Sequence, residues 1–237
     1  MRFIAHRGYS AKYYQNSEEA FIKAGEENFF FGVETDVRLT KDKVWVCCHD
    51  DNPFRNNSLR VSKVNIDVAL SSELKKSKKG MAKWNGPVYL CTYERYLEIN
   101  AKYGMTPIIE LKCKDIDDDS IKNLVELADK ICAGKVIYIG YSAKDLLRIK
   151  AIRPNAKVQV LCKSPYGGNK YLNMGLDIDH MAFTFSPSLL KKARKLNREV
   201  NVWTIRSLIG AKIFVKLGVD YITTDYSYKN KLKSRLD

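Results

Sequence analysis

The segment FIAHRG at residues 3–8 contains in six letters the pattern on which the fold prediction rests. Its apolar run, Phe3-Ile4-Ala5, ends directly in a histidine and an arginine. Charge is costly inside a buried strand and tolerated where the strand ends. Three later apolar runs end in the same way, in Glu34-Thr35-Asp36, in His49-Asp50 and in Glu110-Leu111-Lys112. Strands that all end in charged side chains predict one shared site at the edge of a sheet.

Short β-branched runs alternate with helical segments along the chain, which predicts successive βα units with parallel strands. Eight such units in 237 residues predict an α/β fold of the (β/α)₈ TIM-barrel type. An open doubly wound sheet is the alternative, but no Gly-x-Gly-x-x-Gly follows the first strand. The predicted barrel strands begin at Arg2, Gly32, Thr106, Lys135, Lys157, Asp179, Val200 and Val219. The predicted helices cover residues 17–27, 120–133, 142–151, 167–174, 187–196 and 208–217.

One segment, at about residues 51–88, does not fit this alternation. It is polar, contains the lysine run 75–79 and shows weak periodicity. An extra strand at Val44–Cys48 precedes it and should place His49 near the rim of the barrel. We therefore expect a single domain over residues 1–237 with a small insertion after strand two, acting as a lid that selects substrates. A structural loop with one short helix is the alternative.

The composition favours anionic partners, because 41 basic residues against 27 acidic ones give a net charge of +14. A merely solvated cationic surface is the plainer alternative. The lysine runs lack interleaved aromatic residues for base stacking, so no specific nucleic-acid partner is predicted. No apolar run is long enough for a transmembrane segment. Six scattered cysteines without Cys-x-x-Cys spacing, and a first strand beginning almost at Met1, predict a cytoplasmic protein.

Three acidic residues are candidates for a metal site. Glu34 and Asp36 are two residues apart on a predicted strand, so both side chains face the same way. Glu110, at the end of the next barrel strand, supplies a third carboxylate. Oxygen ligands without sulfur favour Mg²⁺ or Ca²⁺ and also suit Mn²⁺. The alternative is a set of ordinary acids at the surface ends of strands.

Histidines and cations lie beside these acids in the predicted site. His6 and His49, at the ends of two strands, suit a general acid and a general base. Arg7 and Lys112 suit phosphoryl oxygens, although both could equally form ion pairs with the acids. Lys112 could instead act as a Schiff-base lysine, but that chemistry would not need three acids. Trp203, at the end of strand seven, is predicted to form an apolar wall for the substrate or to pack in the core.

These motifs together resemble the glycerophosphodiester phosphodiesterase family. The resemblance runs in order over nearly the whole chain, and the combined pattern is more specific than any single piece. It is carried by HRG at 6–8, NSEEAF at 16–21, GVETDV at 32–37, TKD at 40–42, HDD at 49–51, IELK at 109–112, VWT at 202–204 and GVDYITTD at 218–225.

The resemblance implies a barrel enzyme that binds small-molecule glycerophosphodiesters, such as glycerophosphocholine or glycerophosphoethanolamine. It implies their hydrolysis to glycerol 3-phosphate and an alcohol with the help of a divalent cation. By resemblance, the acid–base pair is His6 and His49, the metal ligands are Glu34, Asp36 and Glu110, and the phosphate contacts are Arg7 and Lys112. Which histidine is the acid, and whether water or the glycerol 2-hydroxyl is the nucleophile, is left open.

Two other functions compete with this interpretation. A related barrel lysophospholipase D would have the same site but would act on lysophospholipid headgroups, and the polar insertion weakly favours soluble substrates instead. A non-catalytic anion-binding protein would use the positive charge alone. Such a binder has no need of paired histidines, so the complete set of seven charged residues argues against it.

Overall fold

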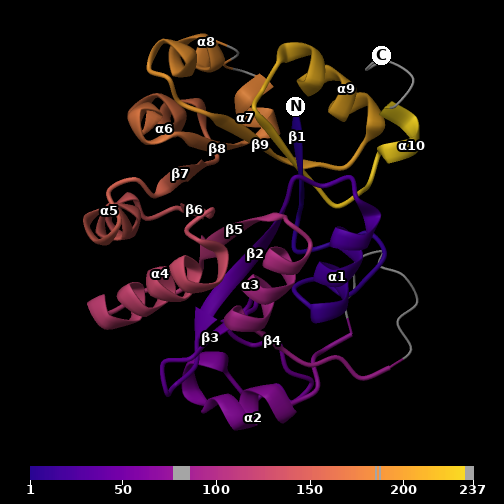
Figure 1. Cartoon of the computed structure of the whole chain (residues 1–237), viewed down its shortest axis with the longest axis vertical. Coiled ribbons are helices and arrows are strands. Elements are labelled where there is room, and N and C mark those ends of the chain that lie inside the picture. The colour runs from indigo at the N-terminus through magenta and orange to yellow at the C-terminus, as the bar shows by residue number, and fades with distance from the viewer. Residues whose placement is uncertain (77–85, 185, 187, 233–237) are drawn as a thin grey trace.

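In the computed structural model, eight parallel strands close into a barrel surrounded by helices, as the sequence predicts (Figure 1). The structure describes residues 1–76, 86–184, 186 and 188–232. The ring closes because β1 pairs with both β10 and β2. The barrel strands are β1 (Arg2–Ala5), β2 (Gly32–Leu39), β5 (Thr106–Leu111), β6 (Ile137–Gly140), β7 (Lys157–Cys162), β8 (Leu176–Asp179), β9 (Val200–Ile205) and β10 (Tyr221–Thr224).

Helices cover the outside of the barrel, and their apolar faces pack against the outward side chains of the strands. Phe21, Leu97 and Ile121, from three different helices, are completely buried in this layer. Burying one such side chain is worth about 1.5–3 kcal/mol. No helix in the described ranges is long and apolar enough to span a membrane. The helices are α1 (Glu18–Glu27), α3 (Tyr93–Lys102), α4 (Asp118–Cys132), α5 (Ala143–Ile152), α6 (Pro165–Lys170), α7 (His180–Thr184), α8 (Ser188–Lys195), α9 (Leu208–Leu217) and α10 (Lys229–Leu232), with a 3₁₀ turn, η2, at Leu172–Met174.

The inside of the barrel is a packed core and not a pore. Ile4, Ile108, Ile139 and Tyr221 belong to a separate apolar cluster contributed by different barrel strands. Because side chains alternate along a strand, the inner face of β5 continues from Ile108 to Glu110. An apolar plug therefore lies below a charged layer at the carboxyl ends of the strands, where TIM-barrel active sites are built.

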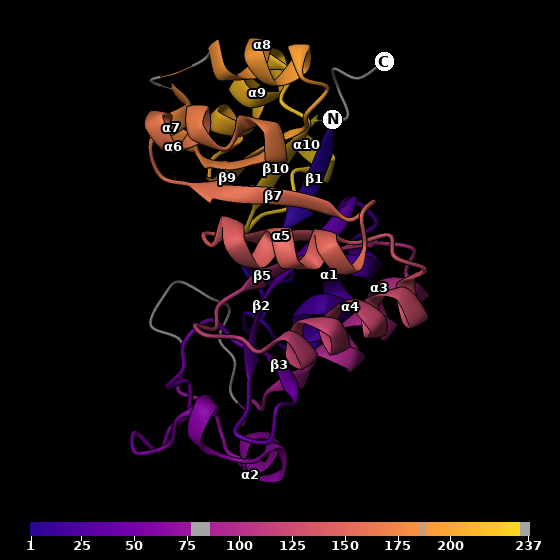
Figure 2. The ribbon, with the colours of Figure 1, turned by 90° about the vertical axis from the view of Figure 1, so that its left-hand side faces the viewer.

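The insertion folds as a small unit of its own. β3 (Trp45–Cys47) pairs antiparallel with β2, and β4 (Cys91–Thr92) pairs antiparallel with β3. The segment between them contains a 3₁₀ turn, η1 (Val61–Lys63), and α2 (Ile66–Ser71). Figures 1 and 2 both show α2 at the end of the molecule opposite to α8 and α9. A separate apolar cluster holds this unit together and includes Val46, Cys48, Phe54, Val61, Ala69, Leu74 and Leu90. Lysines 78 and 79 of the predicted lysine run lie outside the described residues.

The structure corrects the sequence prediction in two elements. The strand predicted to begin at Asp179 is wrong, because β8 ends there and α7 begins at His180. Asp179 Oδ1 accepts hydrogen bonds from the backbone N–H groups of Met181 and Ala182, which favours the start of a helix. Helix α3 is not among the predicted helices, although its Thr92 side chain caps it by accepting from Arg95 N.

Other boundaries differ less. The strands predicted to begin at Lys135 and Val219 begin two residues later. The helix predicted over residues 167–174 is divided into α6 and η2. Pro187, the predicted start of the following helix, lies outside the described residues, and α8 begins at Ser188.

Candidate active site

A tight turn after β1 holds His6 and Arg7 at the mouth of the barrel. Arg7 and Gly8 both have positive φ angles, +56° and +79°. A Cβ atom added at Gly8 would lie 2.7 Å from the Ala20 Cβ atom, so α1 packs directly against the turn. Only glycine combines this backbone conformation with so close an approach. The turn also directs the Arg7 backbone N–H to Glu34 Oε2, at 2.8 Å.

Three buried carboxylates meet at the inner face of β2 and β5. Asp36 and Glu110 are register partners on the two strands, and Glu34 lies two residues before Asp36. One oxygen from each of the three lies within 4.8 Å of the other two. Asp36 Oδ1 and Glu110 Oε1 are buried without a well-aligned hydrogen bond. Converging buried carboxylate oxygens fit a hard divalent cation, and the structure brings together the three acids predicted from sequence.

Arg7 and Lys112 offset part of this negative charge. Arg7 Nε lies 3.0 Å from Asp36 Oδ2. Lys112 Nζ lies 2.5 Å from Glu110 Oε1 and 3.4 Å from Asp36 Oδ1. Three ionised carboxylates against two cations leave one negative charge, in a place where unbalanced charge is costly. A divalent cation together with a phosphodiester monoanion would bring the formal sum to zero.

The pKa shifts follow from this crowding. Burial and the charge of Asp36 raise the pKa of Glu34 well above its ordinary value, and the same causes raise the pKa of Glu110 to about 7. Burial also acts to raise the pKa of Asp36, but Arg7 and Lys112 lower it overall. Burial acts to lower the pKa of Lys112, yet the neighbouring acids raise it. A Schiff-base lysine needs a neutral amine, so this shift argues against that alternative.

Asn16 is a member of the site that the sequence analysis did not identify. Its amide N–H donates to Asp36 Oδ2 at 2.9 Å, and its carbonyl accepts from the Thr35 hydroxyl at 2.9 Å. It is buried, with a positive φ of +56°. The neighbouring Ser17 caps α1 by accepting from Ala20 N. Asn16 therefore orients the metal-ligand candidate Asp36 from the start of α1.

His6 is held by an aspartate from the last strand of the barrel. Its Nδ1 lies 2.6 Å from Asp225 Oδ1. Burial acts to raise the pKa of Asp225, but the hydrogen bond from His6 and the charges of His6 and Arg206 lower it to about 2. The ionised carboxylate can only accept, so Nδ1–H donates and Nε2 is left for chemistry. Ser10 also donates to Asp225, and Arg206 Nε lies 2.5 Å from its other oxygen.

The hairpin of β2 and β3 places His49 at the same mouth of the barrel as His6. The Cys48 N–H donates to Asp36 O, and Arg38 Nε donates to the His49 carbonyl, both across the hairpin. His49 Nδ1 lies 2.7 Å from Asp50 Oδ1. Burial lowers the pKa of both His6 and His49, and the charge of Arg7 lowers both further. Both imidazoles therefore favour the neutral form and lie near the same guanidinium.

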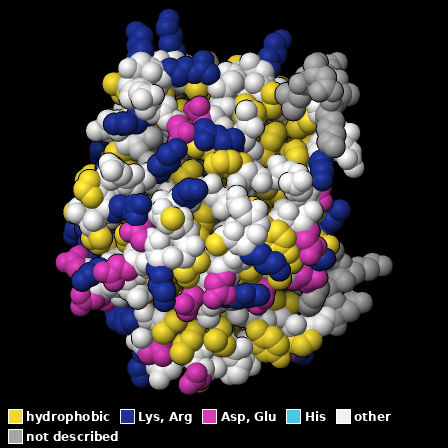
Figure 3. Space-filling model, in the orientation of Figure 1, with side chains coloured by type: hydrophobic (Ala, Val, Ile, Leu, Met, Phe, Trp, Pro, Cys, Tyr) yellow, Lys and Arg dark blue, Asp and Glu magenta, His cyan; other side chains and the backbone are white. Residues whose placement is uncertain are grey.

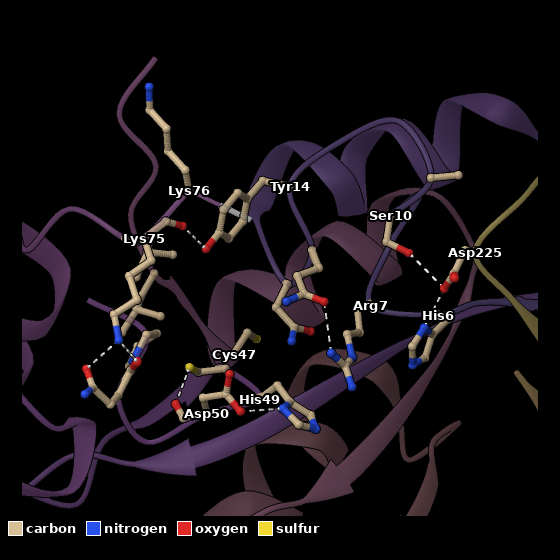
Figure 4. Close-up of a pocket in the computed structure, with 18 of the residues that line it drawn as sticks. His6, Arg7, Ser10, Tyr14, Cys47, His49, Asp50, Lys75, Lys76 and Asp225 are labelled. Carbon is tan, nitrogen blue, oxygen red and sulfur yellow. Dashed lines mark hydrogen bonds and ion pairs between the residues drawn. The ribbon is translucent and has the colours of Figure 1, made fainter. Parts of the chain in front are cut away.

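A cavity of about 980 Å³ joins these groups (Figure 4). His6, Arg7, Asn16 and His49 all line it, and Figure 4 shows the Arg7 side chain between the two imidazole rings in that view. The three carboxylates are buried below its floor, and the Arg7 side chain that lines the cavity also contacts Asp36. The arrangement offers two imidazoles and a guanidinium to a phosphate, with a candidate metal site beneath.

Trp203 contacts the apolar cluster inside the barrel. Its Nε1 donates to the carbonyl of Asp177 at 3.0 Å, and its side chain packs against the apolar plug. It is not among the residues that line the cavity. Packing, the other role predicted for it, accounts for these contacts, and substrate contact by Trp203 stays a prediction.

The chain was compared with known protein families and sequences. Residues 6–229 match the family model described as the glycerophosphoryl diester phosphodiesterase family. A glycerophosphodiester phosphodiesterase of Caldanaerobacter subterraneus subsp. tengcongensis is 28% identical over 233 residues, which cover 94% of this chain and 93% of that protein.

Solved structures share the architecture. A glycerophosphodiester phosphodiesterase from Parabacteroides distasonis superposes with a TM-score of 0.81 at 27% identity, covering 100% of this chain and 98% of the other. A phosphodiesterase from Oleispira antarctica, in complex with the product sn-glycerol-3-phosphate, superposes with a TM-score of 0.79 at 20% identity. The match covers 99% of this chain and 96% of the other. At that identity the second likeness shows the fold alone.

Proposed function

The chain belongs to the glycerophosphoryl diester phosphodiesterase family and is a phosphoric diester hydrolase, and we propose that its substrates are small glycerophosphodiesters. Glycerophosphocholine and glycerophosphoethanolamine would be split into glycerol 3-phosphate and the alcohol. The observation that carries the proposal is a cluster of three buried carboxylates, paired with Arg7 and Lys112, next to a cavity that both imidazoles and Arg7 line. We also propose a cytoplasmic location, since all six cysteines are free.

The divalent cation would be held by Glu34, Asp36 and Glu110. Mg²⁺, Ca²⁺ and Mn²⁺ all suit three carboxylate oxygens. When bound, it supplies Lewis-acid stabilisation of the charge on the phosphoryl oxygens. Lys112 contacts two of the same carboxylates, so its ammonium group would share their oxygens with a bound cation.

Arg7 and Lys112 would stabilise the negative charge that spreads over the phosphoryl group. Arg7 is 17% exposed at its side chain and lies at the cavity, so its guanidinium can meet phosphoryl oxygens without leaving Asp36. The Lys112 side chain is similarly 16% exposed, and its raised pKa keeps it charged. Donors fixed in a partly buried site stabilise a developing charge better than water does, because they need no reorganisation.

The proton transfers would be divided between His6 and His49. Each imidazole is bound through Nδ1 to an aspartate, so each presents Nε2. One takes the proton of the nucleophile, which is water or the glycerol 2-hydroxyl, and the other protonates the leaving alkoxide. A positioned acid or base of this kind contributes about 10²–10⁴-fold to the rate.

One observation favours the alternative of a lysophospholipase D. Large apolar or aromatic side chains are strongly exposed just after three successive barrel strands: Tyr166 (77%) after β7, Met181 (54%) after β8 and Ile209 (73%) after β9. Residues that follow parallel strands lie at the mouth of the barrel. Exposed apolar groups there suit the acyl chain of a lysophospholipid better than a polar diester.

The test is the release of glycerol 3-phosphate from a panel of diesters, with and without EDTA. We expect turnover of glycerophosphocholine or glycerophosphoethanolamine, its loss in EDTA and its recovery when Mg²⁺, Ca²⁺ or Mn²⁺ is added back. Release of choline from lysophosphatidylcholine, without activity on the water-soluble diesters, would favour the alternative. Turnover that is indifferent to EDTA would contradict the metal site.

A further inference from the structure

The cavity extends beyond the two imidazoles and Arg7. From His49 and Asp50 it continues along the insertion, where its wall is formed by residues far from β1 and β10. Figure 4 shows Lys75 and Lys76 on the opposite side of the cavity from His6 and Asp225. The outer wall is formed by Asn52, Pro53, Arg55, Asn57, Leu74, Lys75 and Lys76.

This outer wall is built by specific contacts. The Tyr14 hydroxyl donates to the carbonyl of Lys75 at 2.7 Å, which ties the insertion to the loop before α1. Lys75 Nζ donates to Asn52 O at 3.0 Å and Oδ1 at 3.2 Å, and the Lys75 N–H donates to Pro53 O at 2.8 Å. The backbone positions of these residues are therefore fixed relative to the catalytic mouth.

The charges on the outer wall are not balanced. The acids that line the cavity, Asp50 and Asp225, are both bound to histidines. Arg55 is paired with Glu73 at 3.0 Å, but within the described ranges no carboxylate lies within ion-pair distance of Lys75 or Lys76. Both residues line the cavity, and neither contacts the candidate metal ligands.

This charge is separate from the general basic surface of the protein. Figure 3 shows Lys and Arg side chains spread over the face of the molecule, with several of them at the end formed by α8 and α9, opposite to the insertion. The outer wall thus has its own positive charge inside a concave site, where the field is focused. A neutral alcohol leaving group would make no use of it.

We propose that the outer wall binds a second anionic group of the substrate. The preferred substrates would then be glycerophosphodiesters whose alcohol carries a phosphate of its own. The inference rests on the proposed function, because the scissile phosphate must occupy the catalytic mouth for its alcohol to reach Lys75 and Lys76. A cavity of about 980 Å³ has room for this larger substrate, since pockets for drug-sized ligands measure about 300–1,000 Å³.

The experiment compares two diesters that differ by one phosphate, glycerophosphoinositol and glycerophosphoinositol 4-phosphate. The readout is the ratio of their kcat/KM values for one enzyme preparation, which cancels any loss of folded enzyme. We expect the parent protein to favour the phosphorylated diester by about tenfold at low salt, and added NaCl to reduce the ratio. The double variant Lys75→Gln/Lys76→Gln should bring the ratio close to one.

The matched control is Lys63→Gln, which removes an exposed lysine of the same insertion that does not line the cavity. It should keep the ratio of the parent. The inference is overturned if the parent does not prefer the phosphorylated diester, or if the double variant keeps that preference. In either case hydrolysis of glycerophosphoinositol would leave the proposed function standing. If neither diester is hydrolysed, the proposed function fails and the inference fails with it.

Discussion

The two histidines of the site are bound to aspartates at nearly equal distances but in very different surroundings. His6 Nδ1 lies 2.6 Å from Asp225, and both side chains are largely buried, at 16% and 17% exposed. His49 Nδ1 lies 2.7 Å from Asp50, and these side chains are 36% and 71% exposed. The first pair joins residues 219 positions apart, whereas the second joins neighbours in sequence.

This difference shows two ways of orienting an imidazole. The first pair depends on closure of the barrel, because β1 must pair with β10 before Asp225 can reach His6. It is also strengthened by its low-dielectric surroundings and by donors from Ser10 and Arg206. The His49–Asp50 pair depends only on the end of the β2–β3 hairpin. An exposed ion pair of this kind contributes about 0–1 kcal/mol to stability. We therefore expect Asp225 to matter more for catalysis than Asp50.

The largest effect should come from removing either imidazole. His6→Ala and His49→Ala should each lower kcat by at least about 10²-fold, with little change in thermal unfolding for His49→Ala, whose side chain is 36% exposed at the rim. His180→Ala is the matched control, since the ring of this third histidine lies near the Trp203 carbonyl and Asp179 and does not line the cavity. Steady-state kinetics and thermal melts check this, and full activity in His49→Ala would remove its acid–base role.

The next effect concerns the buried pair. Asp225→Asn should lower kcat by about 10- to 100-fold, because the amide cannot fix and polarise the His6 ring as a carboxylate does. Asp220→Asn is the matched control at the other end of the same strand, where Asp220 accepts from the Val200 N–H. It should retain activity. Equal losses in the two variants would mean that Asp225 has only a structural role.

The pH–rate profile of Asp225→Asn tests the same role of Asp225 in a second way. Burial lowers the pKa of His6, and the hydrogen bond and charge of Asp225 raise it in part. Removing the carboxylate should lower the pKa of His6 further. The limb of the pH–rate profile that belongs to His6 should therefore move to lower pH, whether His6 acts as acid or base. An unmoved profile, or a shift to higher pH, would contradict this assignment.

The smallest effect is expected at the exposed pair. Asp50→Asn should lower kcat by less than about 5-fold, since solvent screens this pair and His49 is also held by its backbone. Asp51→Asn is the neighbouring control, because Asp51 binds Ser62 and not a histidine. A loss in Asp50→Asn as large as that in Asp225→Asn would break the comparison between the two pairs.

The local part of the site could be predicted from sequence because it follows from short-range geometry. The alternation of side chains along a strand places Glu34 and Asp36 on one face. The parallel order of the strands then brings Glu110 to them, through the register of Asp36 with Glu110. The closed barrel was predicted from the count of βα units, and it is confirmed.

The long-range part was missed for a physical reason. Asp225 belongs to a motif that the sequence analysis quoted, and it follows a strand in the same way as His6. Its pairing with His6 depends on the register of Ala5 with Thr224 across the closing seam, which no local pattern shows. Asn16 belongs to the NSEEAF motif that the sequence analysis quoted, but its contact with Asp36 requires the tertiary packing of α1.

The account is tested most directly by the anomalous diffraction of crystals grown with Mn²⁺ and glycerol 3-phosphate. It predicts one manganese peak among the carboxylates of Glu34, Asp36 and Glu110, with the phosphorus atom between the Nε2 atoms of His6 and His49. A peak bound elsewhere, or a phosphate beyond hydrogen-bond reach of both imidazoles, would contradict it.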